Sequence, residues 1–201
     1  MRAYLFWAGL MLGVGGMAGD FVVPSILARS YPGYSHLRDT ISTLGTAGSP
    51  VKRQLRAWLM VLGVCFLGFA AGQAVQFQVF TWRHGLYLAG IIAFRLGTGV
   101  VAGIFPEDPP GVAESVSGKI HGIGAGLGFI LLLLTPLWAR GMVEFSPVRV
   151  WNTLGFGVGL VAFILFLASG KGNGFLRAWT GLWQRIYLAV LYSVLMVNMG
   201  L

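Results

Sequence analysis

The sequence predicts an all-α fold: a polytopic membrane bundle of six transmembrane helices, with a short interfacial helix in the first connection. Of the 201 residues, 56% are hydrophobic and only 10% are charged, whereas a soluble domain carries about 25% charged residues. The mean hydropathy of +0.77 likewise indicates a chain that faces lipid. Six apolar runs also reach the roughly 20 residues that a helix needs to cross the hydrocarbon core.

These runs are expected to form one transmembrane domain over residues 1–201. All should be helical, because backbone exposed to lipid has to form its hydrogen bonds within its own segment. The first run lacks a small-residue cleavage site after a short core, which favours an uncleaved span over a signal peptide. The expected spans are residues 4–27, 55–77, 85–104, 120–138, 150–168 and 178–199.

The first connection is long and partly apolar. Leu37, Ile41 and Leu44 recur at spacings of four and three residues, which predicts the short amphipathic helix at the membrane interface. Such a helix either presents an ordinary solvated face or dips back between the spans.

Basic residues outnumber acidic ones: there are 14 Lys and Arg but only 6 Asp and Glu, for a formal net charge of +8. Nucleic-acid binding is the first interpretation of such a balance. The basic residues, however, stand singly or in pairs at the edges of apolar runs, where long side chains reach the interface and attract anionic headgroups. We therefore expect membrane lipid as a partner and no nucleic acid.

An even number of spans places both termini on one side of the membrane. The first, third and fifth connections then share the opposite face. The polar motifs lie in these connections and in the helix ends next to them. These motifs are residues 34–45, residues 105–111, His121 and the pair Gln184-Arg185. Basic residues are more numerous on this face, which by the positive-inside rule makes it cytoplasmic.

The motifs contain groups suited to acid–base chemistry. His121 is expected one turn inside the fourth span, where it could donate to Asp39 or Asp108 and take part in proton transfer. All three are therefore candidate catalytic residues. The simpler interpretation is a histidine that is only hydrogen-bonded.

The motifs also contain groups suited to an anionic ligand. Guanidinium forks bind phosphate or carboxylate with two parallel hydrogen bonds, so Arg38 and Arg185 are candidate ligand-binding residues, together with Ser42 and Gln184. Because Arg38 and Asp39 are adjacent in sequence, we expect them to contact different partners.

These residues are expected to meet at one edge of the membrane. Arg185 is predicted about two turns inside the sixth span, where an unpaired charge is costly. The first connection should therefore fold inward over the third, fourth and sixth spans. The predicted cluster comprises Arg38, Asp39, Asp108, His121 and Arg185.

Two charges are predicted deep in the membrane. Arg95 precedes Phe105 by ten residues, which puts it about 15 Å below the interface. An arginine at the centre costs at least about 2.5–3.5 kcal/mol unless it faces the bundle interior. Asp20 lies in the same half of the membrane and is its predicted partner. The pair either fixes helix register or takes part in substrate or ion binding.

No metal or cofactor is expected. Of the three histidines, His84 is predicted on the face of the termini, which leaves His36 and His121. Two histidines do not complete a three-histidine zinc site, and bis-histidine haem ligation across the bilayer is disfavoured. A carboxylate-rich metal site at Asp39 and Asp108 is the weaker alternative.

The motifs together resemble the DUF998 family of prokaryotic six-span membrane proteins, and the resemblance covers nearly the whole chain. It rests on Tyr34-Ser35-x-Leu37-Arg38-Asp39-x-Ile41-Ser42-x-Leu44-Gly45, Phe105-Pro106-x-Asp108-Pro109-Pro110-Gly111, His121 and Gln184-Arg185. The family often has a second histidine shortly before the position of His121, where this chain has Ser117 or Gly118.

The resemblance implies a prokaryotic cell membrane and an N-terminus on the inside, which is opposite to the orientation from the charge count. More distantly, the stretch Asp39-Thr40-Ile41-Ser42 resembles six-span eukaryotic proteins of the Frag1 and DRAM types. That second likeness is an analogy of fold and favours lipids only slightly.

Three functions are compatible with these features. The first is a polar site at one membrane face that binds or processes a lipid or another anionic amphiphile. The second is a small ion-coupled transporter that uses Asp20 and Arg95, although no internal repeat of the kind common in transporters is visible. The third is a non-catalytic membrane assembly protein.

Overall fold

The computed structural model describes residues 1–109, 111–143, 146–171 and 174–200. Within these ranges the chain is all-helical, and six helical segments are long and apolar enough to cross a membrane. The predicted fold class is therefore confirmed. The long helices are α1 (Arg2–Ala28), α2 (Lys52–Ala74), α3 (Trp82–Arg95), α5 (Val116–Arg140), α6 (Pro147–Lys171) and α7 (Thr180–Val197).

Short helical elements extend or connect these helices. The third span, Trp82–Ile104, is composite: α3 continues through a π-helix, η2, into the single turn α4. The shorter elements are η1 (Ser42–Gly45), η2 (Leu96–Val101), α4 (Ala102–Ile104), η3 (Arg177–Trp179) and η4 (Asn198–Gly200).

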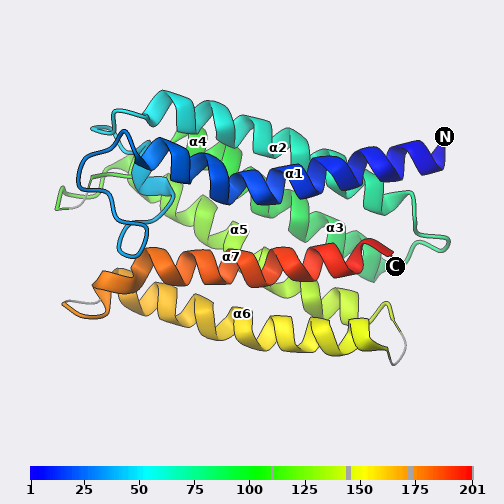
Figure 1. Ribbon diagram of the computed structural model, residues 1–201. Helices are drawn as coiled ribbons and strands as arrows, with labels where there is room; N and C mark the ends of the chain where they lie inside the picture. The colour runs from blue at the N-terminus through cyan, green and yellow to red at the C-terminus, as the bar shows by residue number, and fades with distance from the viewer. Residues whose placement is uncertain (110, 144–145, 172–173, 201) are drawn as a thin grey trace.

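The long helices form an up-and-down bundle in which each packs against the next along the chain. The connections after α1, α4 and α6 lie together at one end, while α1 begins and α7 ends at the other (Figure 1). The polar motifs of three separate connections are thus brought to the same end of the bundle.

The first connection is less helical than its apolar spacing predicts. Only Ser42–Gly45 forms a helix, of the 3-10 type, and turns precede it. Thr40 Oγ1 lies 2.9 Å from both Ser42 Oγ and Thr43 Oγ1, and it accepts a hydrogen bond from the Thr43 N–H. Such side-chain bonds compete with the helical backbone pattern. Ile41 and Leu44 are nevertheless buried.

The third span ends where its sequence predicts. Phe105 adopts an extended conformation, as expected for a residue that precedes a proline, here Pro106. Upstream, the wide turn η2 allows a close approach to α5: a Cβ on Gly97 would lie 2.1 Å from the Gly124 carbonyl oxygen.

Helices α1 and α2 approach each other through glycines. A Cβ on Gly9 would lie 2.7 Å from both the Gly68 carbonyl oxygen and the Gly72 Cα atom. These are backbone atoms of α2, so no rotamer change can relieve the contact. Gly15, also on α1, has nothing within 4 Å of the equivalent position and is exposed.

Gly9→Ala should therefore lower the free energy of unfolding by about 1–3 kcal/mol, the range for overpacking a tight contact. Gly15→Ala is the matched control and should not lower it, because alanine is more favourable than glycine inside a helix by up to about 1 kcal/mol. Thermal unfolding of the purified chain in detergent, followed by tryptophan fluorescence, measures both. Equal effects of the two substitutions would contradict the backbone contact.

Candidate functional site

The first connection is fastened to the start of α7 by backbone hydrogen bonds. The Gly181 N–H donates to the Arg38 carbonyl at 3.2 Å, and the Leu182 N–H donates to the Leu37 carbonyl at 2.9 Å. The first N–H groups of a helix have no partner within it, so the connection supplies acceptors that α7 lacks. The connection therefore folds inward over the sixth span, which is one of the three spans that the prediction names.

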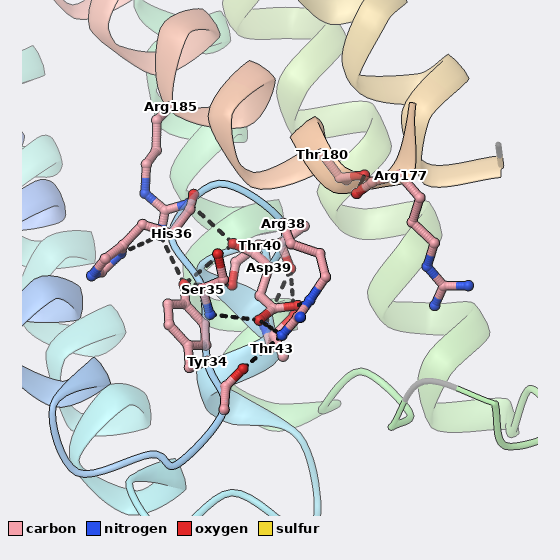
Figure 2. A network of polar contacts seen from close by, with 11 residues as sticks. Tyr34, Ser35, His36, Arg38, Asp39, Thr40, Thr43, Arg177, Thr180 and Arg185 are labelled. Carbon is pink, nitrogen blue, oxygen red and sulfur yellow. Dashed lines mark hydrogen bonds and ion pairs between the residues drawn. The ribbon is translucent and has the colours of Figure 1, made fainter. Parts of the chain in front are cut away.

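The side chain of Arg185 completes this attachment. Its Nη1 donates to the carbonyls of His36 at 2.8 Å and Asp39 at 3.0 Å, and its Nη2 donates to the Tyr34 hydroxyl at 2.7 Å. Nη2 also lies 3.2 Å from His36 Nδ1. Figure 2 shows these groups converging on the guanidinium. Arg185 holds the connection in place. Its Nη1 and Nη2 donors are therefore already used and not free for an anionic ligand.

Arg38 and Asp39 bind each other, so the expectation of separate partners is wrong. Arg38 Nε donates to Asp39 Oδ1 at 2.9 Å, and Arg38 Nη2 donates to Asp39 Oδ2 at 2.8 Å. The same Nη2 reaches the Gly33 carbonyl, and the Ser35 N–H donates to Asp39 Oδ2. The residues lie in a turn rather than a regular helix, and there adjacent side chains can converge.

The environment of this attachment shifts the pKa values of its titratable groups. Burial alone would raise the pKa of the Asp39 carboxyl, but hydrogen bonds from Arg38 and the Ser35 N–H, with the charges of Arg38 and Arg185, leave it below its ordinary value. Burial raises the pKa of Tyr34 despite the nearby Arg185. Burial, followed by the charge of Arg185, lowers the pKa of His36.

Beneath the first connection, a cavity of about 60 Å³ extends among α1, α2, the third span, α5 and α7. Ile41, Ser42 and Gly45 of the connection form part of its wall. Most of the remaining wall is apolar. Its other polar and charged side chains are Asp20, Arg56, Arg95, Thr98, Glu107, His121 and Gln184.

The His121 side chain lines this cavity, and its hydrogen bond defines which ring nitrogen carries the proton. Its Nδ1 lies 3.0 Å from the Phe105 carbonyl oxygen, which can only accept, so Nδ1 carries the proton. In the neutral ring Nε2 is then a hydrogen-bond acceptor. The structure gives Nε2 no protein partner among the described residues.

Ser42 and Gln184 also lie at the cavity. The Ser42 hydroxyl donates to Glu107 Oε2 at 2.6 Å, and Gln184 Oε1 accepts from the Ile41 N–H at 2.8 Å. Glu107 was not singled out in the sequence, because its neighbour Asp108 has the same chemistry and the turn does not show which carboxylate points inward.

Asp108 lies apart from this group. Its Oδ2 accepts a hydrogen bond from the Ser115 N–H at 2.8 Å, just before α5. The polar residues thus form two groups, Arg38-Asp39-Arg185 above and the cavity group below, and the prediction of one cluster containing Asp108 is wrong. The candidate acid–base roles of Asp39, Asp108 and His121 remain predictions.

Arg56 is a further cavity residue that the sequence did not single out. Its Nε donates to the Gly103 carbonyl, and its Nη2 donates to the Ile104 carbonyl at 3.2 Å. These carbonyls lie at the end of the third span, where no later N–H group of the helix donates to them. In the sequence Arg56 follows Lys52 and Arg53 at the start of the second span, so it did not stand out from the basic residues of the interface.

The deepest part of the cavity meets a buried ion pair. Arg95 Nη2 lies 2.5 Å from Asp20 Oδ2, and both side chains are only 4% exposed. The Tyr192 hydroxyl donates to the same carboxylate oxygen at 2.5 Å. The Arg95 guanidinium also lies over the rings of Phe66 and Phe94, 4.2 and 4.6 Å from their centroids. Arg95 Nε is buried without a hydrogen-bond partner among the described residues.

Comparison with known proteins identifies the family. The matching family model is described as a protein of unknown function (DUF998), and it aligns with residues 14–199. The chain belongs to the DUF998 family. No curated protein and no solved structure matches it. In this DUF998 member, no group of three or more His, Cys, Asp or Glu residues suited to a metal occurs among the described residues.

Arg185→Ala should release the first connection. The variant removes hydrogen bonds from a charged donor, each contributing about 1.5–3 kcal/mol, so amide exchange in residues 34–45 should accelerate at least about tenfold. Arg177→Ala is the control, because that side chain is exposed and points away from the network (Figure 2). Hydrogen–deuterium exchange mass spectrometry measures both, and unchanged protection in Arg185→Ala would contradict the attachment.

The attachment should also weaken in mild acid. The attached state holds His36 with a pKa below its ordinary value of 6.5, so the released state binds more protons and gains stability as pH falls below about 6.5. Tyr34 and Asp39 titrate well outside this window. Protection factors for residues 34–45, measured between about pH 7.5 and 5.5, should fall in the wild-type chain and stay constant in His36→Asn.

Proposed function

We propose that this DUF998 protein binds a membrane amphiphile, with the polar end of the ligand in the cavity. The observation that carries the proposal is the cavity itself, which combines polar side chains, including His121 with its unpaired Nε2, with apolar ones. Binding sites for small molecules typically have this character: mostly apolar, with a few placed polar groups.

An unpaired polar atom at the cavity favours a ligand. His121 lines the cavity, and its Nδ1 is bonded to the Phe105 carbonyl, so its Nε2 offers an acceptor. A ligand with a hydrogen-bond donor at its polar end would satisfy this atom.

The walls favour a ligand that is apolar next to its polar end. Leu59, Phe94, Phe129 and Leu188 line the cavity, and all four are buried within the bundle. Apolar surface of this kind binds hydrocarbon through removal from water and through close packing. The cavity lies at the end of the bundle where the motifs gather, so the headgroup would enter near the membrane surface.

Arg38 and Arg185 do not contribute to this proposal as ligand-binding residues. Their guanidinium groups are engaged by Asp39, by loop carbonyls and by Tyr34. The first connection that they hold forms part of the cavity wall, so their role is to close the site. Following the family resemblance, we place the protein in a prokaryotic cell membrane, with both termini on one side.

Filling the cavity tests the proposal. Ala125 lines the cavity, so Ala125→Leu should reduce the amphiphile that copurifies with the full chain by about tenfold, through loss of space equivalent to about 1.4 kcal/mol. Ala57→Leu is the matched control, because Ala57 is exposed on α2. Native mass spectrometry of chain released from nanodiscs measures the bound mass, and equal occupancy in both variants would contradict the proposal.

A further inference from the structure

Gln184 and His121 have unpaired polar atoms at the cavity wall. Gln184 Oε1 accepts from the Ile41 N–H, which fixes the amide and leaves the two donors of Nε2 without a protein partner among the described residues. His121 Nε2 is an unpaired acceptor, because Nδ1 donates to the Phe105 carbonyl. The two side chains are only 6% and 7% exposed, so these atoms depend for a hydrogen bond on whatever molecule occupies the cavity.

The carboxylate of Asp20 adds a third unpaired atom at this wall. Arg95 and the Tyr192 hydroxyl both donate to Oδ2, and Oδ1 has no protein partner among the described residues. In the part of the chain that the structure describes, the unpaired atoms without accessible surface include Arg95 Nε, but neither Asp20 Oδ1 nor the two atoms of Gln184 and His121. A small molecule in the cavity can therefore reach all three.

The three atoms lie at increasing depth below the end of the bundle that holds the polar motifs. Gln184 is four residues after the start of α7 and His121 is five residues after the start of α5, so both lie about 6–8 Å inside at 1.5 Å per residue. Asp20 precedes the end of α1 by eight residues, which is about 12 Å. One water with two hydrogen bonds of about 2.8 Å each bridges such a difference in depth.

The wall selects a small neutral occupant. Its charged side chains are Asp20, Glu107, Arg56 and Arg95, two of each sign, so no charge is left for an ion to neutralise. The occupant has to donate to two acceptors and accept from the Gln184 amide, and water does both. A cavity of about 60 Å³ has room for about four to six waters, since each needs about 10–15 Å³.

We propose that the cavity is a water-filled half-channel, in which about four to six waters connect the motif-bearing end of the bundle with Asp20 in the middle of the membrane. Aromatic rings close its deep end. The Arg95 guanidinium lies over Phe66, and Phe66 and Phe69, which follow on α2 toward the termini, have no exposed surface. Asp20 therefore contacts the aqueous phase on one side only.

This inference does not depend on the proposed amphiphile. The polar end of such a ligand would displace part of the water, because both occupy the same cavity. We therefore design the experiment for the full chain in nanodiscs after any copurified amphiphile has been removed, with native mass spectrometry to verify the removal.

Hydroxyl-radical labelling by X-ray radiolysis tests the half-channel, because the radicals form from water where that water is bound. Two pairs of phenylalanines have matched exposure: Phe94 with Phe66 (1% and 0%), and Phe129 with Phe163 (7% and 8%). Only Phe94 and Phe129 line the cavity. They should be oxidised at least about tenfold faster than their counterparts, because water stays in polar cavities and leaves apolar packing dry.

Two variants locate the water. Ala125 lines the cavity, so Ala125→Leu should displace water and lower the oxidation of Phe94 and Phe129 by about fivefold or more. Ala57→Leu is the control, because Ala57 is exposed on α2, and it should leave both rates at the wild-type value. Peptide mass spectrometry of the digested chain measures all of these rates.

The possible results separate this inference from the proposed function. Equal oxidation within both pairs would overturn the inference, because a dry cavity supplies no radicals. Oxidation of Phe66 as fast as that of Phe94 would overturn it as well, since water would then pass the aromatic rings. Selective oxidation in a chain that copurifies with no amphiphile would support the half-channel and contradict the proposed function, whereas equal oxidation in a chain that does bind an amphiphile would do the reverse.

Discussion

The buried pair of Asp20 and Arg95 is the interaction on which the bundle depends. A charge near the bilayer centre costs at least about 2.5–3.5 kcal/mol, so neither residue can face lipid alone. Their contact at 2.5 Å joins α1 to the third span, and Tyr192 adds α7 through the same carboxylate. Helices distant in sequence are thereby held at one register, because a shift of any of them would leave a buried charge unpaired.

The same pair forms the deep end of the cavity. Arg95 is followed directly by the π-helix Leu96–Val101, and π-turns inside helices are frequent at functional sites. The cavity reaches from this region to the end of the bundle, where Ile41 and Ser42 of the first connection cover it. The buried ion pair and the polar groups beneath the first connection thus line the same cavity.

The arginines near the surface bind groups of the protein itself. Arg185 binds loop carbonyls and Tyr34, and Arg38 is occupied by Asp39 and the Gly33 carbonyl. A guanidinium group presents five donors in a fixed fork, which suits an irregular loop with many free carbonyl groups. The groups left for a ligand are therefore fewer than the sequence motifs indicate, and they lie deeper in the bundle.

The sequence by itself determined the six spans, the end of the bundle at which the motifs meet, and the depth of Arg95. These follow from hydropathy, helix rise and proline positions, all of which are local properties of the chain. Only the tertiary structure decided that Glu107 rather than Asp108 lies at the cavity, and that Arg38 pairs with its neighbour Asp39. Such choices depend on side-chain direction within irregular turns, and no periodic pattern records that direction, because turns lack the repeating geometry of a helix.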